Sequence, residues 1–182
     1  LVLGFDPLHV GLAFLPTNLI MAVFSVWLSA KIVIKFGNRG PLAIGMALVG
    51  LGLISFGFAP ADGSYWINVF PGMILLGIGA GMAFNPLLLA ATSEVPEDES
   101  GLASGVLNTS FMMGGALGLA VLASLAAART AALNAQGIDQ AIALNGGYQI
   151  AFIVGAVCSF VAVALAFLFK KSVAQSHTPQ VH

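Results

Sequence analysis

Charged side chains divide this 182-residue sequence into five long uncharged stretches. The stretches cover residues 7–30, 40–61, 63–93, 100–128 and 140–169. A transmembrane helix needs about 20 consecutive apolar residues, and a charge at its centre costs about 2.5–3.5 kcal/mol. Each stretch has at least 22 residues, and all six basic and seven acidic residues lie outside them. The sequence therefore predicts five transmembrane helices.

Composition indicates a membrane protein as well. Charged residues make up 7% of the chain, whereas soluble domains carry about 25%. The predicted fold class is an all-α membrane protein, with the lipid bilayer around a single domain at residues 1–171. We expect helices at about residues 8–35, 41–59, 66–92, 101–128 and 148–169, followed by a disordered cytoplasmic tail at 172–182. The net charge of −1 argues against a nucleic-acid partner.

Polar side chains inside the predicted helices mark the faces that avoid lipid. The candidates for lining a cavity are Asn18, Ser25, Asn85, Ser104, Asn108, Phe111 and Met112. Asn18 and Ser25 lie on one stripe of the first helix, at 100° per residue, and Asn85 precedes a proline that we expect to kink the third. A polar amide in hydrocarbon costs free energy unless it has a partner. For each asparagine, a hydrogen bond to a neighbouring helix explains the residue as well as contact with cargo does.

Small residues dominate the fourth predicted helix. Between Gly101 and Ala128, 15 of 28 positions are Gly, Ala or Ser. Close approach over small residues is the main way in which helices pack in a bilayer. The glycines that we expect at such contacts are Gly77, Gly81, Gly101, Gly105, Gly114, Gly115 and Gly118. The fourth helix is thus predicted to be tightly packed, whereas helices 41–59 and 148–169, read as apolar all round, are predicted to be peripheral and to face lipid.

Basic residues give the orientation. Lys31, Lys35, Arg39, Lys170 and Lys171 fall on one side of the predicted membrane, and Arg129 falls on the other. Lysine and arginine accumulate on the cytoplasmic side of membrane proteins. We therefore expect the amino end outside and the carboxyl end in the cytoplasm.

The turn at residues 30–39 resembles the cytoplasmic loop signature of the major facilitator superfamily, Gly-x-Leu-x-Asp-Arg-x-Gly-x-Arg. Lys35, Gly37 and Arg39 match the later part of the signature, and Lys31 adds a further basic residue. Ile34 stands where the family has its Asp, which puts the role of that Asp in doubt here. The alternative is that this basic turn only sets the orientation of the chain in the membrane.

A stronger resemblance covers most of the chain, from Gly4 to Lys171. Residues 96–118, PEDESGLASGVLNTSFMMGGALG, are similar to the penultimate helix of the fourteen-helix drug:proton antiporters of that superfamily. Residues 77–86 and 147–152 are similar to the helices before and after it. Phe111 and Met112 replace an Arg-Gln pair that is frequent in the family, which suggests either a more apolar cargo or a different role for this face.

The resemblance implies the carboxyl-terminal part of a secondary transporter in a bacterial inner membrane. Such a protein exports amphipathic compounds by alternating access, against a flow of protons. Proton coupling needs a titratable group inside the membrane. The uncharged stretches hold no Asp, Glu, Lys or Arg, and the three histidines lie outside the apolar cores of the predicted helices. Cys158 is the only cysteine. The coupling carboxylate would belong to missing amino-terminal helices of the same protein, or the protein uses none.

Two other functions stay open at this point. One is a proton-coupled uptake permease of the same superfamily, and the other is a structural membrane subunit that transports nothing. The sequence shows no nucleophile–base pair and no cluster of metal ligands, so we expect neither catalysis nor a cofactor.

Overall fold

The computed structural model describes residues 7–25, 39–61, 63–92 and 95–168, and its elements are helical throughout these ranges. The long helices are α1 (Pro7–Val23), α3 (Arg39–Gly57), α4 (Phe70–Thr92), α5 (Ser100–Ala135) and α6 (Gln140–Leu168). A π-helical turn, Tyr65–Val69, leads into α4, and a short 3-10 turn, Glu97–Glu99, leads into α5. The fold is an all-α membrane fold.

Four of the described helices are long and apolar enough to cross a bilayer. They are Arg39–Gly57, Tyr65–Leu89, Ser100–Ala135 and Gln140–Phe167. The first predicted helix, residues 8–35, is described only as far as residue 25, and α1 itself ends at Val23. The remainder of that helix, with most of the basic turn after it, lies outside the described residues, as does the tail at 172–182.

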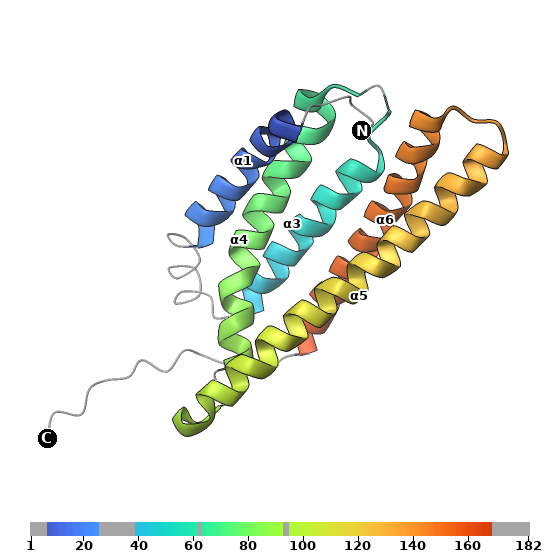
Figure 1. Cartoon of the computed structure of the whole chain (residues 1–182). Helices are drawn as coiled ribbons and strands as arrows, with labels where there is room; N and C mark the ends of the chain where they lie inside the picture. Colours follow the sequence, from blue (N-terminus) through green and yellow to red (C-terminus); the bar gives the residue numbers. More distant parts are fainter. Residues whose placement is uncertain (1–6, 26–38, 62, 93–94, 169–182) are drawn as a thin grey trace, which may run out of the picture.

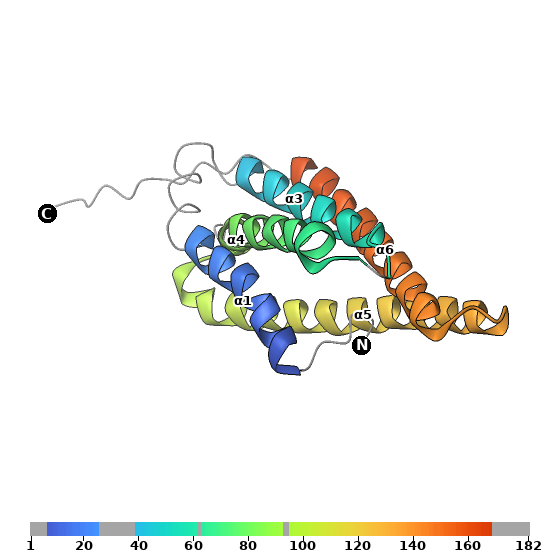
Figure 2. The same cartoon turned by 90° about the horizontal axis from the view of Figure 1, so that it is seen from above.

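The helix α4 lies at the centre of the bundle, between α3 on one side and α5 on the other, with α1 along its flank (Figure 2). Glycines make these contacts close. A Cβ atom on Gly77 or Gly81 of α4 would lie 2.8 Å from a backbone carbonyl of α1, that of Thr17 or of Met21. Gly77 and Gly81 were both expected at a helix contact, and they lie at the α1–α4 contact.

Hydrogen bonds to main-chain carbonyls hold α3 against α6. The buried hydroxyl of Ser159 donates to the carbonyl of Met46 over 2.7 Å. At the end of α3, the side-chain amides of Asn145 and Gln149 both donate to the carbonyl of Ala59, over 3.1 and 2.9 Å. Each bond satisfies a polar group that would be costly to leave unpaired in an apolar environment.

These contacts add a packed face to α3, one of the two helices that were expected to be peripheral and to face lipid. The helix α3 exposes Ile44 and Leu51, and Phe58, directly after the helix, continues this row at a spacing of seven residues. Its other face is packed, and a Cβ atom on Gly50 would lie 2.9 Å from the ring of Phe160 in α6. The helix α3 thus has an exposed face, as expected of a helix that faces lipid, and a second face that is packed through its glycines.

The hairpin of α5 and α6 also differs from the sequence-based bounds (Figure 1). We expected a polar connector at 129–147, but α5 continues to Ala135 and α6 begins at Gln140. The alanine-rich segment after Ala126 has high helix propensity, so it extends α5 beyond the uncharged stretch. Gly137 (φ 76°) ends α5: its N–H donates to Asn134 and the next N–H donates to Leu133, the pattern of a Schellman motif.

Helix α5 is the least packed of the long helices. Ala126 is its one buried residue, and it lies close to Gly147 of α6. Around the five glycines expected to pack, Gly101, Gly105, Gly114, Gly115 and Gly118, a Cβ atom would find nothing within 4 Å. Within the described residues these five glycines therefore have no neighbour, and the close contacts of α5 with α6 lie in its second half, at Leu122, Ala126, Thr130 and Leu133.

Candidate functional site

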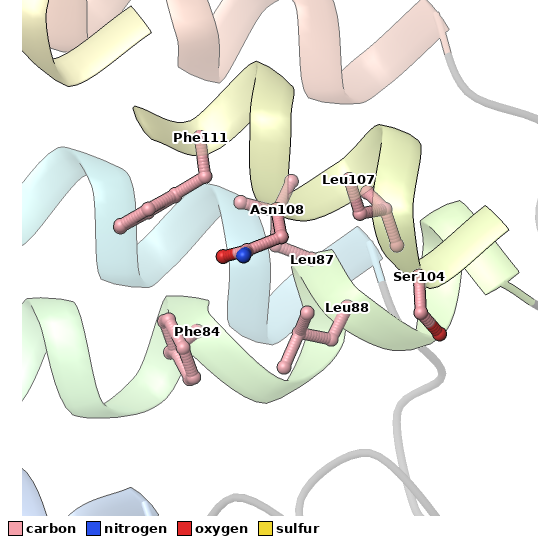
Figure 3. Close-up of a pocket in the computed structure, with 7 residues that line it drawn as sticks. All are labelled: Phe84, Leu87, Leu88, Ser104, Leu107, Asn108 and Phe111. Carbon is pink, nitrogen blue, oxygen red and sulfur yellow. The ribbon is translucent and has the colours of Figure 1, made fainter. Parts of the chain in front are cut away.

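A pocket of about 330 Å³ lies between α4 and the first half of α5 (Figure 3). It is lined by Phe84, Leu87, Leu88, Ser104, Leu107, Asn108 and Phe111. The volume falls at the lower end of the range of small-molecule sites, about 300–1,000 Å³. All seven lining side chains are uncharged, and five of them are apolar.

Helical spacing explains why these residues share one pocket. In α4, Phe84, Leu87 and Leu88 are separated by three and four residues, so they lie on one face. The four lining residues of α5 follow the same rule from Ser104 to Phe111. The two faces are opposed, and the side chains of both helices point into the space between them (Figure 3).

An aromatic contact spans the pocket at one end. The rings of Phe84 and Phe111 have centroids 6.3 Å apart and are nearly perpendicular, at 84°. Edge-to-face pairs of this kind contribute about 0.5–1.5 kcal/mol beyond the burial of their surface. Both side chains stay exposed, at 38% and 66%, so their rings remain available to a further apolar group.

Ser104 and Asn108 are the polar residues of the lining. The hydroxyl of Ser104 donates to the carbonyl of Ser100, one turn earlier in α5, over 2.9 Å. The side-chain amide of Asn108 makes no hydrogen bond with the described part of the chain, and it points toward α4 (Figure 3). Asn108 is thus the one lining residue that offers a free donor and a free acceptor to the pocket.

The other polar candidates lie elsewhere. The amide of Asn85 donates to the carbonyl of Ser25 over 2.7 Å and to its hydroxyl over 3.3 Å. These two hydrogen bonds join α4 to the residues just after α1, and such a bond between helices is one of the two explanations that the sequence left open for this asparagine. Asn18 and Met112 are exposed, and neither is among the residues lining this pocket.

Of the basic turn, only Arg39 is described. A terminal nitrogen of its guanidinium donates to the carbonyl of Phe167, near the end of α6. A cation is favourable at the carboxyl end of a helix because the unpaired carbonyls there carry partial negative charge. Lys31, Lys35 and Gly37 lie outside the described residues.

Comparison with known proteins decides the family. The model of the Major Facilitator Superfamily matches residues 1–119. The chain belongs to the Major Facilitator Superfamily. It is 31% identical, over 97% of its length, to a puromycin resistance protein of Streptomyces alboniger, and 31% identical, over 99%, to a cephamycin export protein of Amycolatopsis lactamdurans. A lincomycin resistance protein of Streptomyces lincolnensis is 38% identical over 66% of the chain.

The Major Facilitator chain covers only part of these relatives. It spans 37%, 35% and 24% of the three proteins, about a third of their length. Its membership confirms the family resemblance seen in the sequence, and it identifies a multi-pass membrane protein of a transporter family rather than an enzyme.

The sequence missed the apolar part of this site. Phe84, Leu87, Leu88 and Leu107 were not among the candidates, since the search followed polar residues in apolar helices. The sequence does contain a signal in α4: the large apolar residues Phe84 and Leu88 lie one position before and three positions after Asn85. Their role follows only from the position of α5 beside α4, which sequence periodicity does not supply.

Proposed function

We propose that this chain forms part of a transporter that exports amphipathic or lipophilic compounds by alternating access, and that the pocket between α4 and α5 lies on the path of the cargo. The observation that carries the proposal is an uncharged pocket with an aromatic pair at one end and an unpartnered amide in its wall. The names of the relatives refer to antibiotic resistance and export, and they support export as the direction of transport.

The proposal includes further helices of the same protein as partners of α5. The relatives are about three times as long as the chain, and the small-residue face of α5 around Gly114 and Gly118 is open in the structure. Small residues of this kind allow close backbone approach between helices in a bilayer. We propose that those helices close the cavity from the other side and carry the carboxylate that couples export to protons.

Orientation and membrane are also part of the proposal. The distribution of basic residues supports an amino end outside and a carboxyl end in the cytoplasm, and the proposed membrane is the bacterial inner membrane. With this orientation, the turn between α5 and α6 lies on the outer side.

Transport by the complete protein tests the proposal. Inside-out vesicles from efflux-deficient bacteria that express the full transporter are supplied with an uncharged antibiotic and with a proton gradient. We expect accumulation of the compound in the vesicles and its loss when an uncoupler collapses the gradient. Proton-driven movement in the opposite direction would indicate an uptake permease, and no flux of any compound in a broad panel would indicate a structural subunit.

A further inference from the structure

We propose that Asn108 sets the charge class of the cargo, and that this site selects uncharged compounds that carry an aromatic ring and a nearby hydrogen-bonding group. The inference rests on the proposed function, since it assigns a cargo class to the pocket between α4 and α5. It concerns one residue, whose chemistry differs from that of every other lining residue.

The first step is the hydrogen-bonding capacity of the wall. The hydroxyl of Ser104 already donates to the carbonyl of Ser100, whereas the side-chain amide of Asn108 has no hydrogen-bond partner in the described structure. An amide in an apolar pocket favours a bound group that both gives and accepts a hydrogen bond. A carbonyl, amide or hydroxyl of the cargo satisfies it, and a pure hydrocarbon does not.

The second step is the charge of the wall. The seven lining residues that this chain contributes include no carboxylate and no basic side chain, so this wall offers no opposite charge to compensate a permanently charged compound for its lost water. Loss of hydration is far more costly for an ion than for a neutral polar group. The wall therefore disfavours permanent cations and anions relative to neutral compounds of the same size.

The third step is the aromatic pair. The rings of Phe84 and Phe111 lie edge to face at one end of the pocket, and the amide of Asn108 lies between α4 and α5 near them (Figure 3). A cargo ring placed against these rings brings a substituent on that ring within reach of the amide. The lining thus favours an aromatic group and a polar group on the same compound.

Two substitutions of nearly the same size test the role of Asn108. Asn108→Leu removes the hydrogen-bonding groups, and Asn108→Asp places a carboxylate in the same wall. They are measured in the full transporter with two uncharged probes, chloramphenicol and linezolid, and two permanent cations, ethidium and tetraphenylphosphonium. Ser110→Asp is the matched control, because Ser110 lies at nearly the same depth in α5 but is not a lining residue. Rates are divided by the amount of each variant in the membrane.

We expect the unaltered protein to prefer the uncharged probes. Asn108→Leu should raise the KM for these probes by about tenfold, the loss expected for one hydrogen bond. Asn108→Asp should raise the ratio of cation to neutral transport by at least about tenfold, because an opposite charge then faces the cation. Ser110→Asp should leave that ratio unchanged.

The opposite results overturn the inference. Transport of some probe by the unaltered protein, with a cation-to-neutral ratio that Asn108→Asp leaves unchanged, would refute the role of Asn108 and leave the proposed function standing. An equal change with Ser110→Asp would show a general effect of charge in α5 and would also refute it. Transport of no probe by the unaltered protein would remove the proposed function, and the inference with it.

Discussion

Gly45 and Gly79 set the distance between α3 and α4. A Cβ atom on Gly45 would lie 2.6 Å from the carbonyl oxygen of Gly79, and one on Gly79 would lie 2.5 Å from that of Gly45. The two backbones are in direct contact at this point. In a bilayer, where lipid is as apolar as leucine, close packing of this kind is a main source of attraction between helices.

Gly79→Ala should therefore destabilise the bundle by about 1–3 kcal/mol, the usual cost of overpacking. Gly155→Ala is the matched control, because the nearest atom to its Cβ would be the end of a leucine side chain, Leu53, at 3.3 Å, which can move aside. The measurement is the apparent Tm of the full transporter in detergent at one scan rate. Equal Tm values for the two variants would contradict the close contact of α3 and α4.

Sequence reasoning found some of these glycines but not their partners. Gly77 and Gly81 were expected to pack from their spacing of four residues, and they do contact α1. Gly79 lies between them on another face and was not singled out, although it makes the closer contact. Spacing identifies a face that permits close approach, whereas the choice of neighbour depends on the arrangement of all the helices.

At the scale of helices, α3 and α6 form a pair joined by polar contacts in an apolar setting. The carbonyl of Ala59 has two lone pairs and accepts from both Asn145 and Gln149. Either amide alone satisfies the carbonyl. The effects of removing them should therefore depend on each other.

We expect Asn145→Leu or Gln149→Met alone to lower stability by about 0.5 kcal/mol or less, since one donor remains. The double variant leaves the carbonyl unpaired and should cost about 1–3 kcal/mol, more than the sum of the two. A double-mutant cycle on the apparent Tm in detergent measures the difference. Strictly additive effects would mean that the two amides do not share this carbonyl.

For the long helices, charge and hydropathy predict some of the boundaries but not all of them. The expected helix 41–59 agrees with α3 to within two residues at each end, and the expected helix 66–92 ends with α4 at Thr92 but starts four residues before it, because charge and hydropathy fix only roughly where a chain crosses a bilayer. Sequence patterns did not predict that α5 continues past residue 128 to Ala135, or that α6 begins at Gln140, eight residues before the expected start at 148. Local signals were available: Gly137 ends α5, and the carboxylate of Asp139 accepts from the N–H of Ala141 at the start of α6, as an N-cap does.

At the scale of the whole molecule, orientation depends on the basic residues and on the turn between α5 and α6. Lys170 and Lys171 follow α6, whereas Arg129 lies near the opposite end of the hairpin. The rule for basic residues assigns the first pair to the cytoplasm.

A reporter of cellular compartment fused after Lys171 should thus read cytoplasm, and one inserted at Gln136 should read the exterior. Both are read in intact bacteria that express the full transporter. The reverse pattern would invert the orientation and, with it, the side from which the pocket opens.

In the proposed transporter, cargo enters the pocket between α4 and α5. The most direct test is protection of a single thiol, after replacement of Cys158, which is exposed, and of any other native cysteine. Leu107→Cys places the thiol in the lining, and Val106→Cys places it at nearly the same depth on another face of α5. The rate of reaction with a small maleimide is measured in the full transporter with and without chloramphenicol.

At a concentration of about ten times its dissociation constant, chloramphenicol should slow alkylation at position 107 by roughly tenfold, because about nine in ten sites are then occupied. The rate at position 106 should not change. An unchanged rate at position 107 while chloramphenicol is being transported, or equal slowing at both positions, would contradict the assignment of this pocket to the path of the cargo.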